Sequence, residues 1–217
     1  MPRRISMTEK VTNAVRLEIT SGVYQSDTLI TEIVVSEKYG VSKTPAREAL
    51  NQLCAEGLLE KIPHKGYLLK RYSAVDLENL IQFRYILEIN AVEIAIQVAS
   101  NQDIARLRKM CDQYDELSEE EAINQYIALN RQFHIALSSL AKNPFITAAL
   151  ANTLDQLKLA LSVDVAENPG AVKLVDHKEI VEAIAQRNVE QARALVGRFV
   201  DNVHSRLPDR WGYPRYF

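Results

Sequence analysis

The 217-residue chain has few of the features that mark secreted or membrane-spanning proteins. Its two cysteines, Cys54 and Cys111, have no metal-ligand spacing and cannot build a disulfide framework. No apolar run approaches the ~20 residues that a membrane-spanning helix needs. The basic start, Met1 to Arg4, is not followed by the apolar stretch of a secretory signal. Seven glycines and seven prolines are few for a turn-rich β fold. These absences predict a mainly helical, cytoplasmic protein with no membrane partner.

The charge of the chain is unevenly distributed. The whole sequence has a formal net charge of −2, which by itself does not favour nucleic acid as a partner. Residues 1–72, however, hold 11 Lys and Arg against 8 Asp and Glu, whereas residues 73–217 hold 15 against 20. A mildly basic front on an acidic body fits a DNA-binding module attached to a second domain.

Residues 40–59 have the pattern of a short helix that reads DNA. Gly40 can supply the turn before it, because glycine adopts positive φ without steric cost, and Ser42 can cap its first amides. Apolar side chains at spacings of three and four define a buried face: Ala46, Ala49, Leu50 and Leu53. The opposite face carries Lys43, Thr44, Arg47 and Asn51. Such a polar front suits the major groove, which predicts a recognition helix.

The surrounding pattern predicts a winged helix-turn-helix over residues 1–72. Helices are expected over residues 8–20 and 32–39, ahead of the recognition helix. Two extended runs, 58–62 and 67–70, are joined by Pro63-His64-Lys65-Gly66, which is a hairpin signal.

Residues 73–206 read as an all-α helical bundle, followed by an aromatic C-terminal tail at 207–217. Helices are expected at 75–99, 102–117, 119–140, 144–163, 171–186 and 189–205, with a loop at 164–170. The tail either packs on a surface or is a loose end.

Residues 8–71 closely resemble the DNA-binding domain of the GntR family of bacterial transcription regulators. The resemblance is carried by Gly40-Val41-Ser42, Thr44-Pro45, Arg47-Glu48-Ala49-Leu50, Leu53, Glu56-Gly57-Leu58 and Gly66. One residue departs from the family, which usually has arginine where this chain has Lys43. Lysine keeps a phosphate or guanine contact but cannot form the bidentate fork of arginine.

The helical remainder resembles the FCD class of effector domains, named after the C-terminal domain of a fatty-acid regulator. The resemblance is carried by Phe83-Arg84, Leu87-Glu88, Asn130, Phe133-His134, Asn143, His177, Ala183-Ile184 and Ala192. It implies an effector pocket inside the bundle, and arginines of the first helix often line that pocket.

The FCD resemblance also implies a metal centre, because many of these domains hold a divalent metal with one acidic residue and three histidines. His134 and His177 match two of the histidines. Asn130 falls where the family usually has Asp, and Phe199 falls where the third histidine is expected. The ligand set is therefore incomplete, and no cofactor can be assigned from the sequence.

The sequence leaves several interpretations of these residues open. His134 and His177 belong to a weakened metal site, to a metal-free polar pocket for the effector, or to the core as satisfied histidines. Arg84 either forms an i,i+4 ion pair with Glu88 or faces the bundle interior and binds a carboxylate. Effector binding is accordingly assigned to Arg84, Asn130, His134 and His177.

For DNA, we expect Arg47 to read a base edge, with a salt bridge to a neighbouring carboxylate as the alternative explanation. Lys43, Thr44 and Asn51 complete the groove-facing side, and Lys65 and Gly66 form the wing tip. The sequence predicts a non-enzymatic, metabolite-responsive regulator, a repressor, that binds a palindromic operator as a homodimer with a small carboxylate effector. The competing hypotheses are a metal-dependent all-α enzyme using His134 and His177, and a winged-helix module that binds protein.

Overall fold

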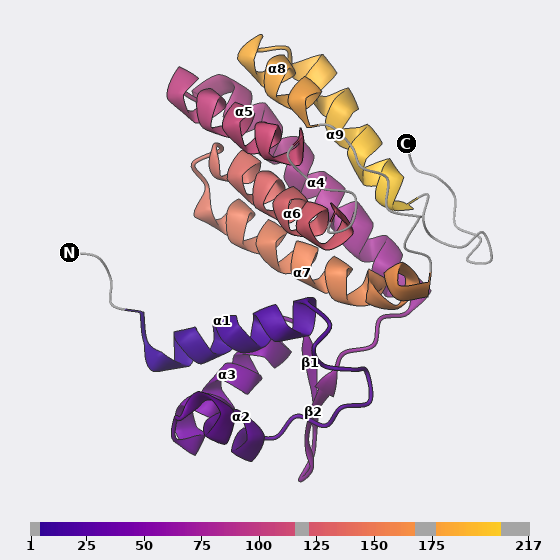
Figure 1. Ribbon diagram of the computed structural model, residues 1–217. Helices are drawn as coiled ribbons and strands as arrows, with labels where there is room; N and C mark the ends of the chain where they lie inside the picture. The colour runs from indigo at the N-terminus through magenta and orange to yellow at the C-terminus, as the bar shows by residue number, and fades with distance from the viewer. Residues whose placement is uncertain (1–4, 116–121, 168–176, 205–217) are drawn as a thin grey trace. The chain divides into compact units, whose positions relative to one another are not determined.

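The computed structural model describes residues 5–115, 122–167 and 177–204. The chain divides into two compact units, of which the first contains Met1–Ser73 and the second begins at Ala74. Figure 1 labels the helices and strands of both units. In the described residues, none of the helices combines the length and the apolar character needed to cross a membrane.

The first unit is a winged helix-turn-helix. Its elements are α1 (Met7–Thr20), α2 (Glu32–Tyr39), α3 (Lys43–Ala55), β1 (Leu59–Ile62) and β2 (Gly66–Leu69). The two strands pair antiparallel, from Leu59 opposite Leu69 to Ile62 opposite Gly66, and form the wing (Figure 1). The predicted fold class is confirmed.

The helix starts of this unit differ in how they are capped. Ser6 accepts a hydrogen bond from the Glu9 amide at the start of α1, and Thr31 accepts one from the Val34 amide at the start of α2. Both bonds come from the third residue of the helix, which is a usual donor to a cap. The predicted cap by Ser42 is wrong, because Ser42 makes no side-chain cap bond to α3. The third residue of α3 is Pro45, which has no N–H to donate.

The core of the winged helix fixes the orientation of α3. Val15 of α1 and Leu50 and Leu53 of α3 are completely buried. Backbone hydrogen bonds in both directions between Ile30 and Tyr67, each 2.8 Å, join the wing to the segment before α2. The apolar side of α3 is therefore buried, and its polar side is left for solvent.

The second unit is an all-α bundle. Its helices are α4 (Ala74–Val98), α5 (Asn101–Asp115), α6 (Ala122–Ser139), α7 (Pro144–Glu167), α8 (Lys178–Ala185) and α9 (Val189–His204). The predicted loop from Asp164 is wrong over its first part, because α7 continues to Glu167. No glycine or proline lies between Pro144 and Pro169, so nothing in the local sequence ends the helix earlier. The expected helix over 171–176 and the aromatic tail at 207–217 lie outside the described residues.

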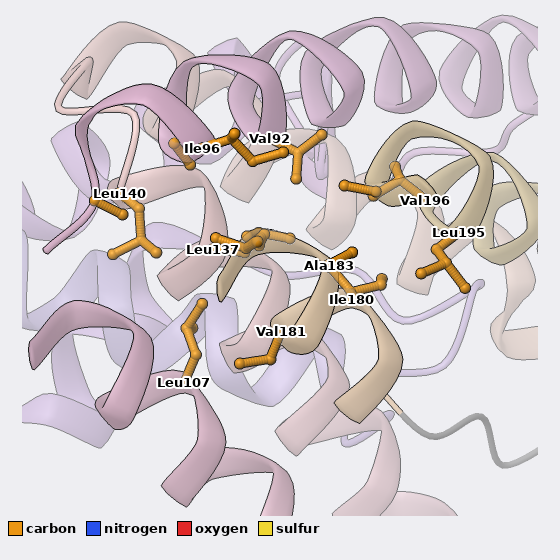
Figure 2. Packing of buried hydrophobic residues seen from close by; sticks show 14 of the residues in the cluster. Val92, Ile96, Leu107, Leu137, Leu140, Ile180, Val181, Ala183, Leu195 and Val196 are labelled. Atoms are coloured by element: carbon orange, nitrogen blue, oxygen red, sulfur yellow. The ribbon is translucent and has the colours of Figure 1, made fainter. Parts of the chain in front are cut away.

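The bundle core is built from side chains of α4, α5, α6, α8 and α9. Figure 2 shows Val92 and Ile96 of α4 near Leu137 of α6, with Ile180 and Val196 of α8 and α9 in the same cluster. At the turn between α8 and α9, Arg187 adopts a left-handed φ of 57°. Its guanidinium donates to the carbonyls of Ile96 and Ala99, which ties this turn to the end of α4.

Candidate functional site

The polar face of α3 is exposed and carries the residues predicted to meet DNA. Lys43, Thr44, Arg47 and Asn51 are all exposed, whereas Ala46, Ala49, Leu50 and Leu53 on the opposite face are buried. The missing side-chain cap leaves the first amides of α3 without a side-chain acceptor from Ser42. A helix start with free N–H groups and the positive end of the helix dipole favours phosphate.

Arg47 forms the salt bridge that was the alternative explanation for it. Its Nε lies 2.8 Å from Oε1 of Glu32, and its terminal nitrogen lies 2.9 Å from Oε2, so the contact is bidentate. The Arg47 hydrogen bonds are the main cause that lowers the pKa of Glu32, and Lys61 and Lys43 contribute at longer range. Glu32 thus sits among three cations on the face that would approach DNA. The Arg47 side chain is still 57% exposed.

Asn51 is hydrogen-bonded to the wing through its side-chain oxygen. The hydroxyl of Tyr67 in β2 donates to Oδ1 of Asn51 over 3.1 Å. A bidentate adenine contact needs both the carbonyl and the amide of asparagine. In this geometry one lone pair of Oδ1 is occupied, and both amide N–H donors of Asn51 are left for a purine N7, a guanine O6 or a phosphate.

The two predicted wing-tip residues differ in character. Lys65 is exposed in the turn, and its backbone N–H donates to the Ile62 carbonyl. Gly66 has a φ of 148°, and a Cβ there would lie 2.5 Å from the carbonyl oxygen of Ile30. Gly66 is therefore required by the close approach of the wing to Ile30, and its contact with DNA remains a prediction.

A buried polar cluster of four side chains lies in the second unit, where three helices converge. Arg84 and Glu88 come from α4, His134 from α6 and His177 from the N-cap of α8, and all four are buried. Arg84 Nε donates to Glu88 Oε1 over 2.7 Å, and a terminal Arg84 nitrogen lies 3.0 Å from His134 Nε2. His177 Nε2 lies 3.4 Å from the same His134 nitrogen. Arg84 therefore forms the i,i+4 ion pair inside the bundle, and its binding of an effector carboxylate remains a prediction.

The protonation of His134 follows from its neighbours. Arginine has only N–H donors, so His134 Nε2 must present its lone pair and the ring proton lies on Nδ1. Nδ1 is 3.1 Å from Glu88 Oε2, an electrostatic contact whose atoms are not aligned as a conventional hydrogen bond.

The charge states of the cluster are set by burial and by Arg84. Burial lowers the pKa of His134, and burial with the neighbouring His134 lowers that of His177 to about 2. Burial opposes ionisation of Glu88, but Arg84 and His134 outweigh it and lower its pKa to about 2. The cluster thus holds one carboxylate, one guanidinium and two neutral imidazoles at neutral pH.

Asn130, a predicted ligand, and Phe199, which stands where the family's third histidine is expected, do not join the cluster as ligands. Asn130 is half-buried, four residues before His134, and no hydrogen bond in the described part of the chain links it to either histidine. Phe199 of α9 packs on His177, with ring centroids 4.5 Å apart and an interplanar angle of 30°. Within residues 5–115, 122–167 and 177–204, no group of three or more His, Cys, Asp or Glu side chains is arranged to hold a metal.

Sequence reasoning missed the two acidic residues that control these sites. Glu88 was noted only as an ion-pair partner, although its i,i+4 spacing from Arg84 was the signal that both face the same way. Glu32 had no comparable signal, because its contact with Arg47 spans 15 residues between two helices.

Comparisons with known proteins agree with both units. The family model described as "Bacterial regulatory proteins, gntR family" matches residues 7–69, and the "FCD domain" model matches residues 79–202. The Nta operon transcriptional regulator of Aminobacter aminovorans is 30% identical over 77% of this chain and 78% of its own length. The "Probable D-xylose utilization operon transcriptional repressor" of Paenarthrobacter nicotinovorans is 26% identical over 87% and 83%. The structure of E. coli McbR/YncC shares the fold, with a TM-score of 0.77, 20% identity and coverage of 93% of this chain and 97% of that one.

Proposed function

The chain belongs to the GntR family of bacterial regulatory proteins and carries an FCD domain, and from this premise we propose that it is a metabolite-responsive repressor. It binds a palindromic operator as a homodimer and releases it when a small carboxylate occupies the helical unit. Such a protein acts in the cytoplasm, where the chromosome is. The single observation that carries the proposal is the exposed Lys43–Thr44–Arg47 face of α3, held in a winged helix-turn-helix.

The protein is a transcriptional regulator and not an enzyme. Its matched family models and the relatives described above are those of regulators. This excludes the metal-dependent enzyme that was considered for His134 and His177. A module that binds only protein is disfavoured by membership of a DNA-binding family.

For DNA binding, α3 enters the major groove with Arg47 toward a base edge. To reach guanine, Arg47 must exchange its bidentate contact with Glu32 for a bidentate contact with O6 and N7. Lys43 and Thr44, in the first turn of α3, contact phosphate together with the free amides there. Lys65 at the wing tip approaches the backbone or the minor groove.

For effector binding, the buried cluster supplies the polar groups of the bundle interior. Removing polar side chains from water costs free energy, which pairing between them must offset. Stability of the bundle alone therefore does not explain why four such side chains are buried together in an apolar core. Arg84 uses one N–H for Glu88 and one for His134, and arginine has five. Its remaining donors suit a carboxylate, with Asn130 and His177 as further partners, while His134 orients the guanidinium.

For dimer formation, α4 offers an apolar strip. Phe83 and Ile86, three residues apart, are 45% and 49% exposed, and Val75 lies on the same helix at 51%. Large exposed apolar side chains grouped on one helix are typical of interaction surfaces. Two copies of the chain also give the two half-sites that a palindromic operator requires.

A gel shift with the intergenic DNA beside the protein's own gene tests the proposal. We expect a discrete complex that unlabelled specific DNA removes and scrambled DNA does not. The Arg47→Ala variant should lose discrimination worth about 1–3 kcal/mol, since a bidentate guanine contact is removed. Candidate carboxylates added to the complex should identify the effector by releasing the DNA. If Arg47→Ala distinguished specific from scrambled DNA as well as the wild type does, the assignment of α3 as the recognition helix would be refuted.

A further inference from the structure

The side chains around His134 conflict with the divalent metal that the FCD resemblance implies. A metal ligand must offer a free lone pair, and each neutral imidazole has only one. The lone pair of His134 is on Nε2, which faces a terminal nitrogen of Arg84 at 3.0 Å. The other ring nitrogen, Nδ1, carries the proton and faces Glu88 at 3.1 Å. His134 therefore has no free lone pair for a metal.

We infer that the Arg84 guanidinium takes the place of the metal, so that this FCD domain folds and works without a divalent ion. Arginine stays protonated under all ordinary conditions, so the charge that it brings is permanent. Its position is fixed by the 2.7 Å bond to Glu88 one turn along α4, and the two side chains are only 5% and 1% exposed. A divalent ion beside this buried guanidinium would be strongly repelled.

The remaining positions of the family's ligand set agree with this inference. Phe199 presents an aromatic ring where an imidazole is expected, 4.5 Å from the His177 ring and 5.9 Å from the His134 ring. Phe133 packs on His177 from α6, with centroids 4.3 Å apart. Asn130 brings an uncharged amide where the family has a carboxylate. Thus the surroundings of the imidazoles provide one fixed cation and two aromatic rings instead of metal ligands.

The inference also gives Glu88 a role. In a metal site, a carboxylate at this position would compensate for a divalent charge. Here one carboxylate, Glu88, balances one guanidinium, Arg84, across a contact of 2.7 Å. Adding a divalent ion would leave an uncompensated charge in the apolar core, which is costly.

Metal content and thermal unfolding of the full-length, untagged protein test the inference. The protein is incubated with Zn²⁺, Ni²⁺ or Mn²⁺, freed of excess metal, and analysed by elemental mass spectrometry. We expect far less than one equivalent per chain and a Tm that neither the metals nor EDTA shifts. His64→Ala, which removes an exposed wing imidazole, controls for surface binding. A stoichiometric metal that is lost in His134→Ala but kept in His64→Ala would overturn the inference.

Two further variants test Arg84 itself as the obstacle. Phe199→His adds the missing imidazole but leaves Arg84 in place, so it should stay metal-free. Arg84→Met together with Phe199→His frees the His134 lone pair and should gain stoichiometric metal, with a Tm that metal raises and EDTA lowers. Metal binding by Phe199→His alone, or a folded double variant that stays metal-free, would contradict the role of Arg84. Should the double variant not fold, the wild type and Phe199→His still decide the question.

Discussion

At the scale of single residues, we expect the pairing of Arg47 with Glu32 to influence how strongly α3 attracts DNA. Glu32 contacts Arg47 through both oxygens, and its pKa is lowered by Arg47 first and also by Lys61 and Lys43. A carboxylate among three cations opposes the phosphate backbone, which is the main source of sequence-independent affinity. We therefore expect Glu32 to limit binding to DNA of arbitrary sequence while it holds Arg47 by a bidentate contact.

The Glu32→Gln substitution should raise affinity for non-operator DNA and lower the ratio of specific to non-specific binding. The change removes one negative charge with little change of shape. The slope of log K against log salt concentration should become steeper by roughly 1, as for one added phosphate contact. Fluorescence anisotropy with operator and scrambled duplexes over a salt series measures both quantities. Glu37→Gln makes the same charge change on an exposed part of α2 and serves as the control.

A Glu32→Gln protein whose affinity falls equally for both duplexes would show that Glu32 acts only through the stability of the fold. A protein indistinguishable from Glu37→Gln would show that the ion pair has no influence on DNA binding.

The positions of some of these residues could be predicted from the sequence and those of others could not. The difference is whether a position depends on neighbours along the chain or on packing between helices. The exposed face of α3 follows from helical periodicity, so Lys43, Thr44 and Arg47 could be placed from local spacing alone. The partner of Arg47 could not be placed, because it depends on the packing of α2 against α3. The Ser42 cap failed for a local reason that the sequence did contain, namely the missing N–H of Pro45.

At the scale of elements, the wing depends on Gly66. A Cβ at this position would lie 2.5 Å from the Ile30 carbonyl oxygen, and the φ of 148° is rarely adopted by other residues. The Ile30 backbone also forms the bridge to Tyr67, and the Tyr67 hydroxyl in turn contacts Asn51 on α3. A shift of the wing is thus transmitted to the DNA-reading helix.

Gly66→Ala should therefore destabilise the winged helix by about 1–3 kcal/mol and weaken operator binding beyond that loss of stability. Urea unfolding gives the free energy, and anisotropy at a temperature where the protein remains folded gives the affinity. Gly22→Ala is the matched control, because Gly22 also has a positive φ, of 77°, but nothing lies within 4 Å of its Cβ position. Gly22→Ala should cost about 1 kcal/mol and leave operator affinity unchanged. Similar effects of the two substitutions on affinity would contradict the proposed link.

The convergence of α4, α6 and α8 on the buried cluster makes the second unit sensitive to acid. The pKa values of His134 and His177 are lowered from 6.5, so both histidines stay neutral when folded and bind protons when unfolded. Below pH 6.5 the unfolded state therefore binds more protons, and stability falls as the pH falls. Glu88, with a pKa lowered to about 2, adds to this loss below about pH 4.5.

We expect the free energy of unfolding to decrease between about pH 6.5 and 5 by up to about 1.4 kcal/mol per pH unit for each buried histidine. Urea titrations at several pH values, followed by circular dichroism, measure the slope. His177→Gln should reduce this slope by about the contribution of one histidine, while His64→Gln should leave the slope unchanged. A slope that is equally steep in wild type and His177→Gln would mean that other groups cause the acid sensitivity.

The ends of helices could be predicted from the sequence where a capping residue or a helix-breaking residue marks them. Helix α2 ends at Gly40, in a left-handed conformation with φ 63°, as the turn pattern predicted. Helix α7 was expected to end at Val163 but continues to Glu167, since no breaker lies between these residues. The convergence of Arg84, Glu88, His134 and His177 was visible only through family resemblance, because no local pattern brings three helices together.

At the scale of the whole molecule, we propose that the regulator works as a pair of chains. A single α3 contacts few base pairs, and two-fold symmetry of the protein then matches the palindrome of its operator. The exposed Phe83 and Ile86 on α4 are the residues that we assign to the contact between the chains.

The Phe83→Glu substitution should convert the dimer to a monomer and weaken operator binding at the same time. A charge placed in an apolar interface loses its hydration without gaining a partner. Sedimentation velocity over a concentration series gives the oligomeric state. Phe145→Glu, at a residue that is 83% exposed on α7, is the control and should remain dimeric. Dissociation by Phe145→Glu and not by Phe83→Glu would place the interface on α7 instead.

The most direct test of the central claim is hydroxyl-radical footprinting of the intergenic DNA with wild type and Arg47→Ala. The account predicts two protected patches related by two-fold symmetry, about 10 base pairs apart from centre to centre, one for each α3. Arg47→Ala should lose both patches together. Protection of a single unsymmetrical stretch, or two patches that persist in Arg47→Ala, would contradict a dimeric regulator that reads its operator through α3.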